Sequence, residues 1–373
     1  MSDVPHLRFP EFSGEWEKCS IQDYGEVVTG NTPPTSHAEY YENGSYLWAS
    51  PADLGINKNI TETKTKLSLS GFKKTRSIPK GSVLVTCIGS TIGKMGMAAE
   101  TMSSNQQINS IVVNDKSNSD FVYYAICRAF PRYLSEVAVQ AVPILSKSNF
   151  EKLPNYTTCR DEQDKIGYFL NLLDERIATQ NKIIEDLKKL KSAIAETVFN
   201  NMQGHLTNLS AICNIVKGKQ VNGEELSEKG KYYVMNGGIT PSGYYDQCNT
   251  PANTISVSEG GNSCGYVQYN KSSFWSGGHC YTLQDITSGV DTQYLFHYLK
   301  RYESNIMNLR IGTGLPNIQK KDLENFRIAL PPSNVQKEIS TCLTAIEDKI
   351  MVEVKWLDSA QKEKQHLLRQ MFI

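Results

Sequence analysis

The stretch PILSKSNFEKLPNYTTCRDEQDKIGYFLNLLDERI, residues 143–177, occurs again in altered form as PNIQKKDLENFRIALPPSNVQKEISTCLTAIEDKI, residues 316–350. The two copies align without a gap at an offset of 173 residues, and the register continues until Phe199 falls on Phe372. The matched pairs include Lys147 with Lys320, Glu151 with Glu324, Gln163 with Gln336, Ile166 with Ile339 and Leu170 with Leu343. This repeat indicates that the chain is one structural unit written twice.

The second part of each copy predicts a long helix, because apolar residues recur at steps of three and four, as in a coiled-coil seam. The seam residues are Ile166, Leu170, Leu173, Ile177, Ile184, Leu187, Ile194 and Val198 in the first copy, and Ile339, Leu343, Ile346, Ile350, Leu357, Leu367 and Met371 in the second. Each helix is about 40 residues long, which corresponds to roughly 60 Å.

Two equal helices in one chain allow two interpretations. They could join separate chains as an oligomerisation coil, or they could pair with each other and give one chain an approximate two-fold axis. Both seams hold a polar residue at the same position, Gln180 and Glu353. Antiparallel pairing would bring these two residues near mid-length, where polar seam residues fix register. We therefore predict an internal antiparallel coiled coil.

The segments before the helices resemble each other only loosely and predict small α+β domains. Short strands such as SVLVTCI, INSIVV, YYVMN and CYTLQDI are separated by Gly, Asn and Ser turns. One amphipathic helix follows in each copy, at residues 120–136 and 291–307. The predicted organisation is a first strand-rich domain at 1–158, a helix at 159–203, a second strand-rich domain at 204–332 and a helix at 333–373.

Composition places the chain among globular proteins without a membrane span. The 373 residues carry no formal net charge, and no 18-residue apolar run occurs. The N-terminus lacks the pattern of a signal peptide, and the nine cysteines include no C-x-x-C pair. These features favour reduced thiols in the cytoplasm over a disulfide framework. We expect no metal site, because the histidines and cysteines are scattered.

The stretch IGSTIGKMG, residues 88–96, follows an apolar run and could be taken for a phosphate-binding loop. That loop needs four residues between its glycines and a Ser or Thr after the lysine. Here three residues separate Gly89 from Gly93, and Met95 follows Lys94. A tight turn between two strands is the simpler interpretation. An amino-methyltransferase is disfavoured too, because the NTPPT stretch at 31–35 only partly resembles the required motif and no S-adenosylmethionine loop occurs.

Two divergent domains, each followed by a similar long helix, resemble the specificity subunit of type I restriction–modification systems. The residues that carry the resemblance are Gly30 with Pro33-Pro34, YLWAS, GSVLVTCIGSTIGKMG and NQQINS, together with LSKSNFEKLPN and PPSNVQKEI where each copy enters its helix. The second copy departs by having Cys264-Gly265-Tyr266 where the first has Gly-Lys. The first copy departs by lacking the counterpart of Pro331-Pro332.

The resemblance implies a non-catalytic protein that reads a bipartite double-stranded DNA site with two target-recognition domains. It also implies partners, namely two modification (methyltransferase) subunits and two restriction (motor and nuclease) subunits. No cofactor is then expected on this chain, since S-adenosylmethionine, ATP and Mg would bind the partner subunits. The alternative is a coiled-coil scaffold without sequence-specific DNA binding, which would explain the helices but not the two unlike glycine-rich domains.

Candidate DNA-binding residues are basic side chains for phosphates and polar or aromatic side chains on turns for base edges. In the first copy they are Lys73, Lys74, Arg76, Ser90, Thr91, Lys94, Asn105, Gln106 and Gln107; in the second they are Lys217, Lys219, Tyr244, Tyr245, Asn262, Ser263 and His279. No catalytic residue is expected among them. Lys94 is the strongest single candidate for a DNA phosphate contact.

Overall fold

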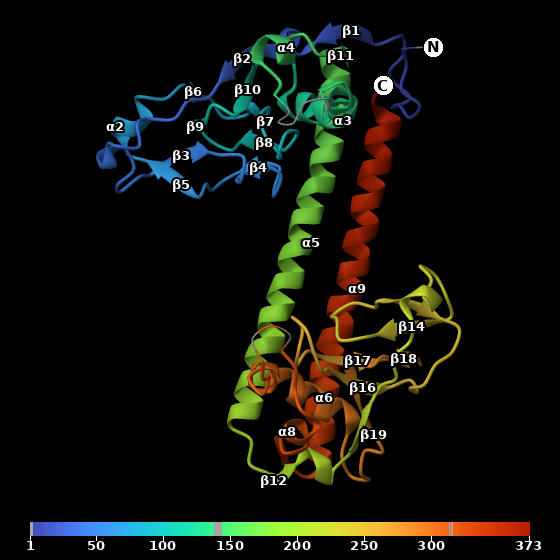
Figure 1. Ribbon diagram of the computed structural model, residues 1–373. Coiled ribbons are helices and arrows are strands. Elements are labelled where there is room, and N and C mark those ends of the chain that lie inside the picture. Colours follow the sequence, from blue (N-terminus) through green and yellow to red (C-terminus); the bar gives the residue numbers. More distant parts are fainter. Residues whose placement is uncertain (1–2, 138–143, 313, 315) are drawn as a thin grey trace. The chain divides into compact units, whose positions relative to one another are not determined.

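The computed structural model describes residues 3–137, 144–312, 314 and 316–373 (Figure 1). Pro143, with which the repeated stretch begins, lies outside the described residues. The chain divides into two compact units: unit 1 comprises residues 1–182 and 355–373, and unit 2 comprises residues 183–354. Each unit contains one strand-rich domain and parts of two long helices, α5 (Arg160–Asn200) and α9 (Ser333–Met371).

Domain 1 is the part of unit 1 that precedes α5. Its strands are β1 (Glu17–Ser20), β2 (Gly25–Thr29), β3 (Tyr46–Ala49), β4 (Asn59–Ile60), β5 (Thr65–Leu67), β6 (Ser77–Ile78), β7 (Val83–Thr86), β8 (Met95–Ala98), β9 (Met102–Ser104), β10 (Ile108–Val113) and β11 (Pro154–Thr157). Its helices are α1 (Ile21–Tyr24), η1 (Ala38–Tyr40), α2 (Leu69–Phe72), α3 (Ser119–Val137) and α4 (Lys147–Glu151).

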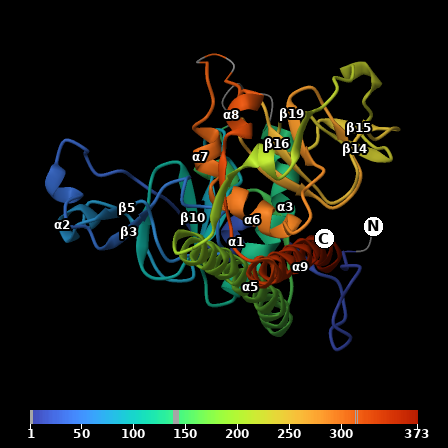
Figure 2. The same ribbon diagram turned by 90° about the horizontal axis from the view of Figure 1, so that it is seen from below.

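The strands of domain 1 form a sheet of order β2-β10-β7-β8-β4, a second sheet of order β5-β3-β9-β6, and the pair β1-β11. The first sheet packs against α3 and the start of α5, and its core includes Val83, Phe121 and Ile166. In Figures 1 and 2, α2, β3 and β5 lie at the side of domain 1 that is farthest from α5. Domain 1 therefore has an inner sheet on its helices and an outer sheet beyond it.

Domain 2 lies between α5 and α9 in the chain. Its strands are β12 (His205–Asn208), β13 (Asn214–Lys217), β14 (Tyr232–Met235), β15 (Gly243–Tyr245), β16 (Thr254–Ser258), β17 (Val267–Asn270), β18 (Trp275–Ser276), β19 (Cys280–Gln284) and β20 (Arg327–Leu330). Its helices are η2 (Leu209–Ala211), η3 (Gly223–Glu225), α6 (Thr292–Arg301), α7 (Glu303–Met307) and α8 (Lys320–Glu324). The sheets have the orders β13-β19-β16-β17, β15-β14-β18 and β12-β20.

The strands expected from sequence are present as β7, β10, β14 and β19, and the α+β class is confirmed. The helix expected at 120–136 is α3. The single helix expected at 291–307 is wrong, because it breaks at Tyr302 into α6 and α7. Tyr302 has φ −96° and ψ 20°, its hydroxyl donates to the Phe199 carbonyl, and the neighbouring Glu303 accepts from the backbone of Val267. These contacts hold the chain in a turn.

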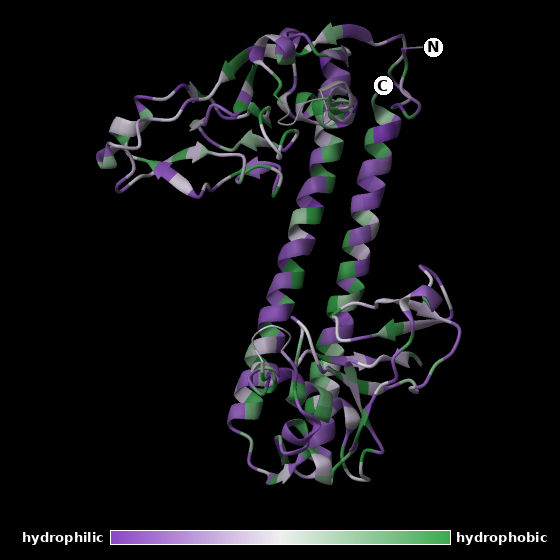
Figure 3. Cartoon of the chain, viewed as in Figure 1, coloured by the Kyte–Doolittle hydropathy of each residue, from purple (hydrophilic) through white to green (hydrophobic). Residues whose placement is uncertain are grey.

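The long helices pack against each other inside each unit. In unit 1, Asp174 of α5 pairs with Lys364 of α9, and the Arg176 guanidinium lies 4.7 Å from the ring centroid of Trp356. A step forward along α5 is thus a step back along α9, so the helices run antiparallel. The buried seam residues are Ile166, Leu170, Ile184, Leu343 and Met371. Hydrophobic and hydrophilic residues alternate along both helices, as expected of amphipathic helices (Figure 3).

Candidate nucleic-acid interface

The glycine stretch of domain 1 is a turn between two antiparallel strands, β7 and β8. Gly89 and Gly93 have φ of 93° and 89°, a conformation that favours glycine. A strand follows this turn where a phosphate loop requires a helix, so the nucleotide-binding alternative is wrong and the tight turn is confirmed. Domain 2 repeats the turn between β16 and β17, where Gly261 and Gly265 have φ of 78° and 91°.

A second glycine in each domain permits a close backbone approach. A Cβ atom on Gly30 would lie 2.2 Å from the Ser104 carbonyl oxygen, and one on Gly218 would lie 2.2 Å from the Gly277 carbonyl oxygen. No side chain fits at either position, since real Cβ atoms do not come within 3.0 Å of other heavy atoms. In domain 1 the chain that leaves β2 therefore passes directly over the backbone that precedes β10. In domain 2 the chain that leaves β13 passes in the same way over the backbone that precedes β19.

An indole holds the residue after each of these glycines. Trp48 of β3 donates through Nε1 to the carbonyl of Asn31 (3.1 Å), and Trp275 of β18 donates through Nε1 to the carbonyl of Lys219 (2.8 Å). The two tryptophans lie on different members of a parallel strand pair, β3 with β9 and β14 with β18. The two domains thus fix the same turn with an indole from a different strand.

The basic candidates of domain 1 lie on the outer sheet. Lys73, Lys74 and Arg76 are exposed between α2 and β6. The Asn31 side chain holds this segment, because its Nδ2 donates to the Lys74 carbonyl and its Oδ1 accepts from the Arg76 backbone, both at 2.8 Å. The Arg76 guanidinium also donates to the Thr29 carbonyl (2.8 Å). Asn31 was not among the predicted site residues, because the sequence offered it only as the first residue of the incomplete NTPPT motif.

The polar cluster at 105–107 divides into three different environments. Asn105 is buried, and its side chain bonds both the backbone and the amide of Gln107 (2.9 and 3.2 Å). Gln106 is exposed and accepts from the Thr32 hydroxyl at 2.5 Å. Gln107 is half-buried beside the glycine turn, its Nε2 3.6 Å from where a Gly89 Cβ would lie. Asn105 thus positions its neighbour, whereas Gln106 and Gln107 reach the surface.

The turn candidates of domain 1 join this cluster. Ser90 and Lys94 are exposed and Thr91 is half-buried. The Lys94 stem lies against Gly55, within 3.3 Å of where a Cβ would stand. The structure therefore brings Ser90, Thr91, Lys94 and Gln107 together around one turn. The basic candidates of the outer sheet are not part of this group, and their segment is held instead by the residues on either side of Gly30.

The candidates of domain 2 surround its own glycine turn. Lys217 and His279 are exposed and face the same buried carboxylate, Glu259, which sequence reasoning missed. Asn262 is exposed and Ser263 half-buried on the turn itself. The remaining candidates lie on the β15-β14-β18 side: exposed Lys219, half-buried Tyr244, and half-buried Tyr245, whose ring centroid is 5.0 Å from that of Trp275.

An ionic cluster joins domain 1 to both long helices in unit 1. The Tyr124 hydroxyl of α3 donates to Asp174 of α5 (2.6 Å), and Asp174 also pairs with Lys364 of α9. Lys58, 7% exposed, pairs with Asp120 (2.6 Å) and donates to Asn171 (2.7 Å). Burial lowers the pKa of Lys58, while Asp120 acts to raise it. Burial is also the main cause of the raised pKa of Tyr124.

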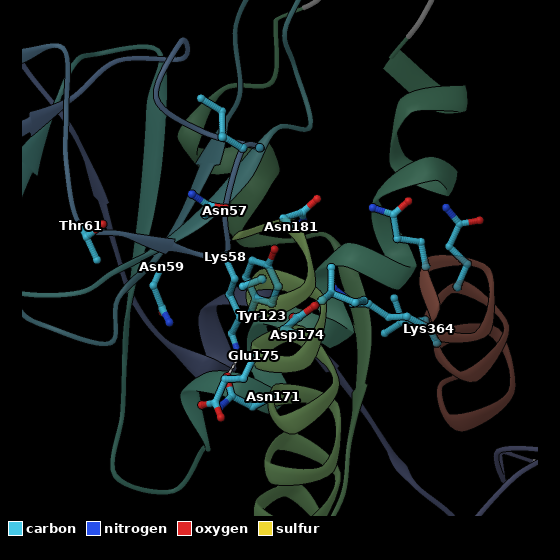
Figure 4. A pocket seen from close by; sticks show the side chains of 17 residues that line it. Asn57, Lys58, Asn59, Thr61, Tyr123, Asn171, Asp174, Glu175, Asn181 and Lys364 are labelled. Atoms are coloured by element: carbon cyan, nitrogen blue, oxygen red, sulfur yellow. Dashed lines mark hydrogen bonds and ion pairs between the residues drawn. The ribbon is translucent and has the colours of Figure 1, made fainter. Parts of the chain in front are cut away.

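Lys58, Asn171, Asp174 and Lys364 border a cavity of about 810 Å³ in unit 1. Figure 4 shows Lys58 pointing toward Asn171 of α5, and Lys364 reaching from α9 toward Asp174. The loop that carries Lys58 bonds to β8, because the Lys58 carbonyl accepts from the Met97 backbone at 2.7 Å. The loop is therefore held by α5 on one side and by the sheet that bears the glycine turn on the other.

Unit 2 has a corresponding cluster built from other residues. His297 of α6, 2% exposed, bonds the Thr344 hydroxyl through Nε2 (3.0 Å), and its Nδ1 lies 4.0 Å from Glu347 of α9. Lys191 of α5 pairs with Glu347 at 3.0 Å. Burial, with Lys191 as the second cause, lowers the pKa of His297 to about 3. The imidazole is therefore neutral in the folded protein at neutral pH.

Within the part of the chain that the structure describes, no three His, Cys, Asp or Glu side chains gather in a way that would hold a metal ion. None of the helices among these residues has the length and apolarity to cross a membrane.

A family model for the type I restriction modification DNA specificity domain matches residues 13–189 and 206–357. The chain belongs to this family. The two matches fall on the two strand-rich domains and the first parts of their long helices. They confirm the resemblance drawn from sequence and give the chain two target-recognition domains. The family recognises DNA and is not itself catalytic.

Relatives agree with this assignment. The chain is 30% identical to the type I restriction enzyme MjaVIII specificity subunit of Methanocaldococcus jannaschii, with 97% of this chain and 92% of that protein covered. It is 28% identical over 185 residues to the HindI specificity subunit of Haemophilus influenzae, with 47% of this chain and 39% of that protein covered. The crystal structure of a type I restriction-modification S subunit from M. genitalium has the same fold, with a TM-score of 0.75 at 20% identity and 99% of both chains covered.

Proposed function

We propose that this chain directs a type I restriction–modification complex to a bipartite double-stranded DNA site, with each domain reading one half-site. The observation that carries the proposal is the contrast within the repeat. The domains share a strand framework, a glycine turn and a close backbone approach, yet they carry different side chains around that turn. A common scaffold with different surface residues suits two readers of different sequences.

Two modification subunits and two restriction subunits are the proposed partners, and these supply methylation and ATP-dependent cleavage. S-adenosylmethionine, ATP and Mg would then bind the partners, and the complex would act in the cytoplasm. Support for docking on the helices comes from exposed apolar side chains, which mark protein-binding surfaces when they gather. They are Tyr168, Leu172, Ile183 and Leu190 on α5 and Met351, Val352 and Val354 on α9.

The proposed phosphate contacts of domain 1 are Lys73, Lys74, Arg76 and Lys94, which are exposed on the same domain. Each phosphate contact adds roughly 0.9 to the negative slope of log affinity against log salt. Replacing all four by alanine should therefore reduce that slope by about three to four, with similar loss of affinity on every sequence. The measurement is fluorescence anisotropy on duplex DNA between about 50 and about 200 mM salt.

A matched control replaces Lys116 and Lys152, two exposed lysines outside the proposed surface, and should keep the wild-type slope. An unchanged slope in the quadruple variant would show that the basic run is only a solvated face. Selection of bound duplexes from random DNA, with the modification subunits present, separates the proposal from the scaffold alternative. A scaffold would enrich no bipartite sequence.

A further inference from the structure

Domain 2 holds a buried carboxylate at the base of its glycine turn. Glu259, 8% exposed, follows β16 directly. Its Oε1 accepts from Lys217 Nζ (2.5 Å) and from the Tyr281 hydroxyl (3.3 Å). Its Oε2 is buried, makes no hydrogen bond to the described residues, and faces Nδ1 of His279 at 3.4 Å. A buried carboxylate costs several kcal/mol unless it is paired, so these neighbours determine its environment.

The backbone shows which residues of domain 1 occupy the same places. The Glu259 amide donates to the His279 carbonyl (2.9 Å), and the Cys87 amide donates to the Gln107 carbonyl (2.8 Å). Glu259 also accepts from the backbone of Ile318, as Cys87 does from that of Leu145. Glu259 thus corresponds to Cys87, and His279 corresponds to Gln107.

The supporting side chains differ in the same way. At the strand pair beside the turn, domain 1 has Thr29 donating to Asn109 (2.7 Å), where domain 2 has Lys217 opposite Tyr281. Domain 1 therefore carries neutral groups where domain 2 carries an acid, a lysine and a phenol. Burial raises the pKa of the Cys87 thiol to about 12, so this position is uncharged in domain 1.

The carboxylate of Glu259 favours one tautomer of the neutral His279 ring over the other. Nδ1 lies 3.4 Å from Glu259 Oε2, and the negative charge of the carboxylate repels a lone pair on that nitrogen, so the neutral imidazole favours hydrogen on Nδ1 and an acceptor at Nε2. The side chain is 62% exposed. Its backbone amide donates to Asn236 Oδ1 (3.1 Å), which holds the backbone at this position. The result is a surface acceptor beside the turn Gly260–Ser263, with a carboxylate next to its other ring nitrogen.

We propose that His279 is a specificity-determining residue of domain 2, whose Nε2 accepts a hydrogen bond from the exocyclic amine of a base in the second half-site, and that Glu259 is its positioning residue. The inference rests on the proposed function. In the major groove, adenine and cytosine present an exocyclic amine, whereas guanine and thymine present acceptors there. An acceptor at Nε2 therefore favours adenine or cytosine at one position.

The test is selection of bound duplexes with both half-sites randomised, using the full chain together with modification subunits. His279→Ala should lower the preference for adenine or cytosine at one position of the second half-site by about tenfold, while the first half-site and the spacer stay unchanged. Glu259→Gln keeps the shape of the side chain and should lower the same preference by a smaller factor. His205→Ala, at another exposed histidine of unit 2, is the control and should keep the wild-type preferences.

His279 is exposed, so its alanine variant tests the proposal even where Glu259→Gln fails to fold. A wild-type chain that selects a bipartite site, together with a His279→Ala variant that selects the same bases, overturns the inference alone. Uniform weakening on all sequences also overturns it, because that result indicates a phosphate contact. A wild-type chain that selects no bipartite site overturns the proposed function and this inference with it.

Discussion

The ionic cluster of unit 1 and that of unit 2 are the same arrangement made with different chemistry. Asp174 and Glu347 lie 173 residues apart, and so do Lys191 and Lys364. Each unit therefore pairs an acid on the helix that follows its domain with a lysine on the other helix. The domain helix presents Tyr124 to this pair in one unit and His297 in the other.

The difference teaches which contacts the fold requires and which it leaves free to vary. The acid–lysine pairs connect the two long helices, and they are kept. The third member of each cluster comes from the domain, and it differs between the halves. In unit 1 it is the Tyr124 phenol, which donates to the acid, and in unit 2 it is the His297 imidazole, which bonds the Thr344 hydroxyl. Removing a feature that both halves share should therefore lower stability to a similar extent in either half. Removing a contact that differs between the halves should lower the stability of one half only.

The largest expected effect concerns a feature that both domains share, the close backbone approach at a glycine. Gly30→Ala and Gly218→Ala place a Cβ 2.2 Å from a backbone carbonyl oxygen in each domain. Since backbone must move, we expect each variant to lose more than about 4 kcal/mol of stability, which is exceptional for a single substitution. The loss should be confined to the domain that carries the change. Limited proteolysis followed by mass spectrometry would show which domain opens.

Gly223→Ala is the matched control, because a Cβ there meets nothing within 4 Å. It should change stability by no more than about 0.5 kcal/mol. If Gly30→Ala unfolded domain 1 while Gly218→Ala left domain 2 intact, the two close approaches would not be equivalent, and the shared framework would be weaker than the backbone bonds indicate.

An intermediate effect should appear in unit 1 alone. Lys58 is a buried cation that pairs with Asp120, and removing one member of a buried pair leaves the other without compensation. Because Asp120 is partly exposed, we expect Lys58→Met to cost about 2–3 kcal/mol rather than the full cost of a buried charge. Denaturant unfolding followed by hydrogen exchange would assign the loss to unit 1.

Two further variants sharpen this prediction. Lys58→Met with Asp120→Asn removes both charges and should recover most of the loss, since the uncompensated charge is gone. Lys64→Ala, at an exposed lysine, should change stability by less than about 0.5 kcal/mol. A double variant as unstable as the single one would mean that Lys58 acts through packing rather than through charge.

The repeat was sufficient to predict the framework but not the contacts between side chains. Gln163 and Gln336 were matched by sequence, and both accept from the backbone residue before the domain helix, Asn118 and Asp291, at 2.9 Å. Lys191 and Lys364 lie in the same gap-free alignment, yet their partners depend on which helix faces meet. That is a property of packing, which a single helical pattern does not determine.

The side-chain contacts of the turn region were harder to predict from the sequence, because its two copies have diverged. Glu259 stands where domain 1 has Cys87, so no identity marked it, and a carboxylate among small polar residues gives no periodic signal. Asn105 was expected on the surface with Gln106 and Gln107, yet its amide turns inward to Gln107. Side-chain direction in an irregular turn depends on backbone conformation, and residue type alone does not specify it. The interface residues remain predictions.

The smallest expected effect belongs to unit 2 alone and depends on pH. Burial holds the pKa of His297 near 3, whereas an unfolded histidine titrates near 6.5. Between these pH values the unfolded chain binds a proton at this histidine that the folded chain does not bind. The stability that depends on the neutral imidazole is therefore fully present above about pH 6.5 and is lost progressively as the pH falls. We expect a loss of about 1 kcal/mol per pH unit below pH 6.

The groups around His297 are Thr344, Glu347, Lys191 and Asp291, and the control must leave them in place. We expect His297→Gln to do so, because its side-chain amide does not titrate and has the donor and acceptor needed to bond the Thr344 hydroxyl. Comparing the denaturant midpoints of the two proteins at about pH 7, 6 and 5, which covers the upper part of this pH range, isolates this histidine from the carboxylates that titrate in both. The wild type should lose stability more steeply, and hydrogen exchange should assign the difference to unit 2. Equal slopes would mean that the imidazole charges without cost, and the two clusters would then differ in shape but not in chemistry.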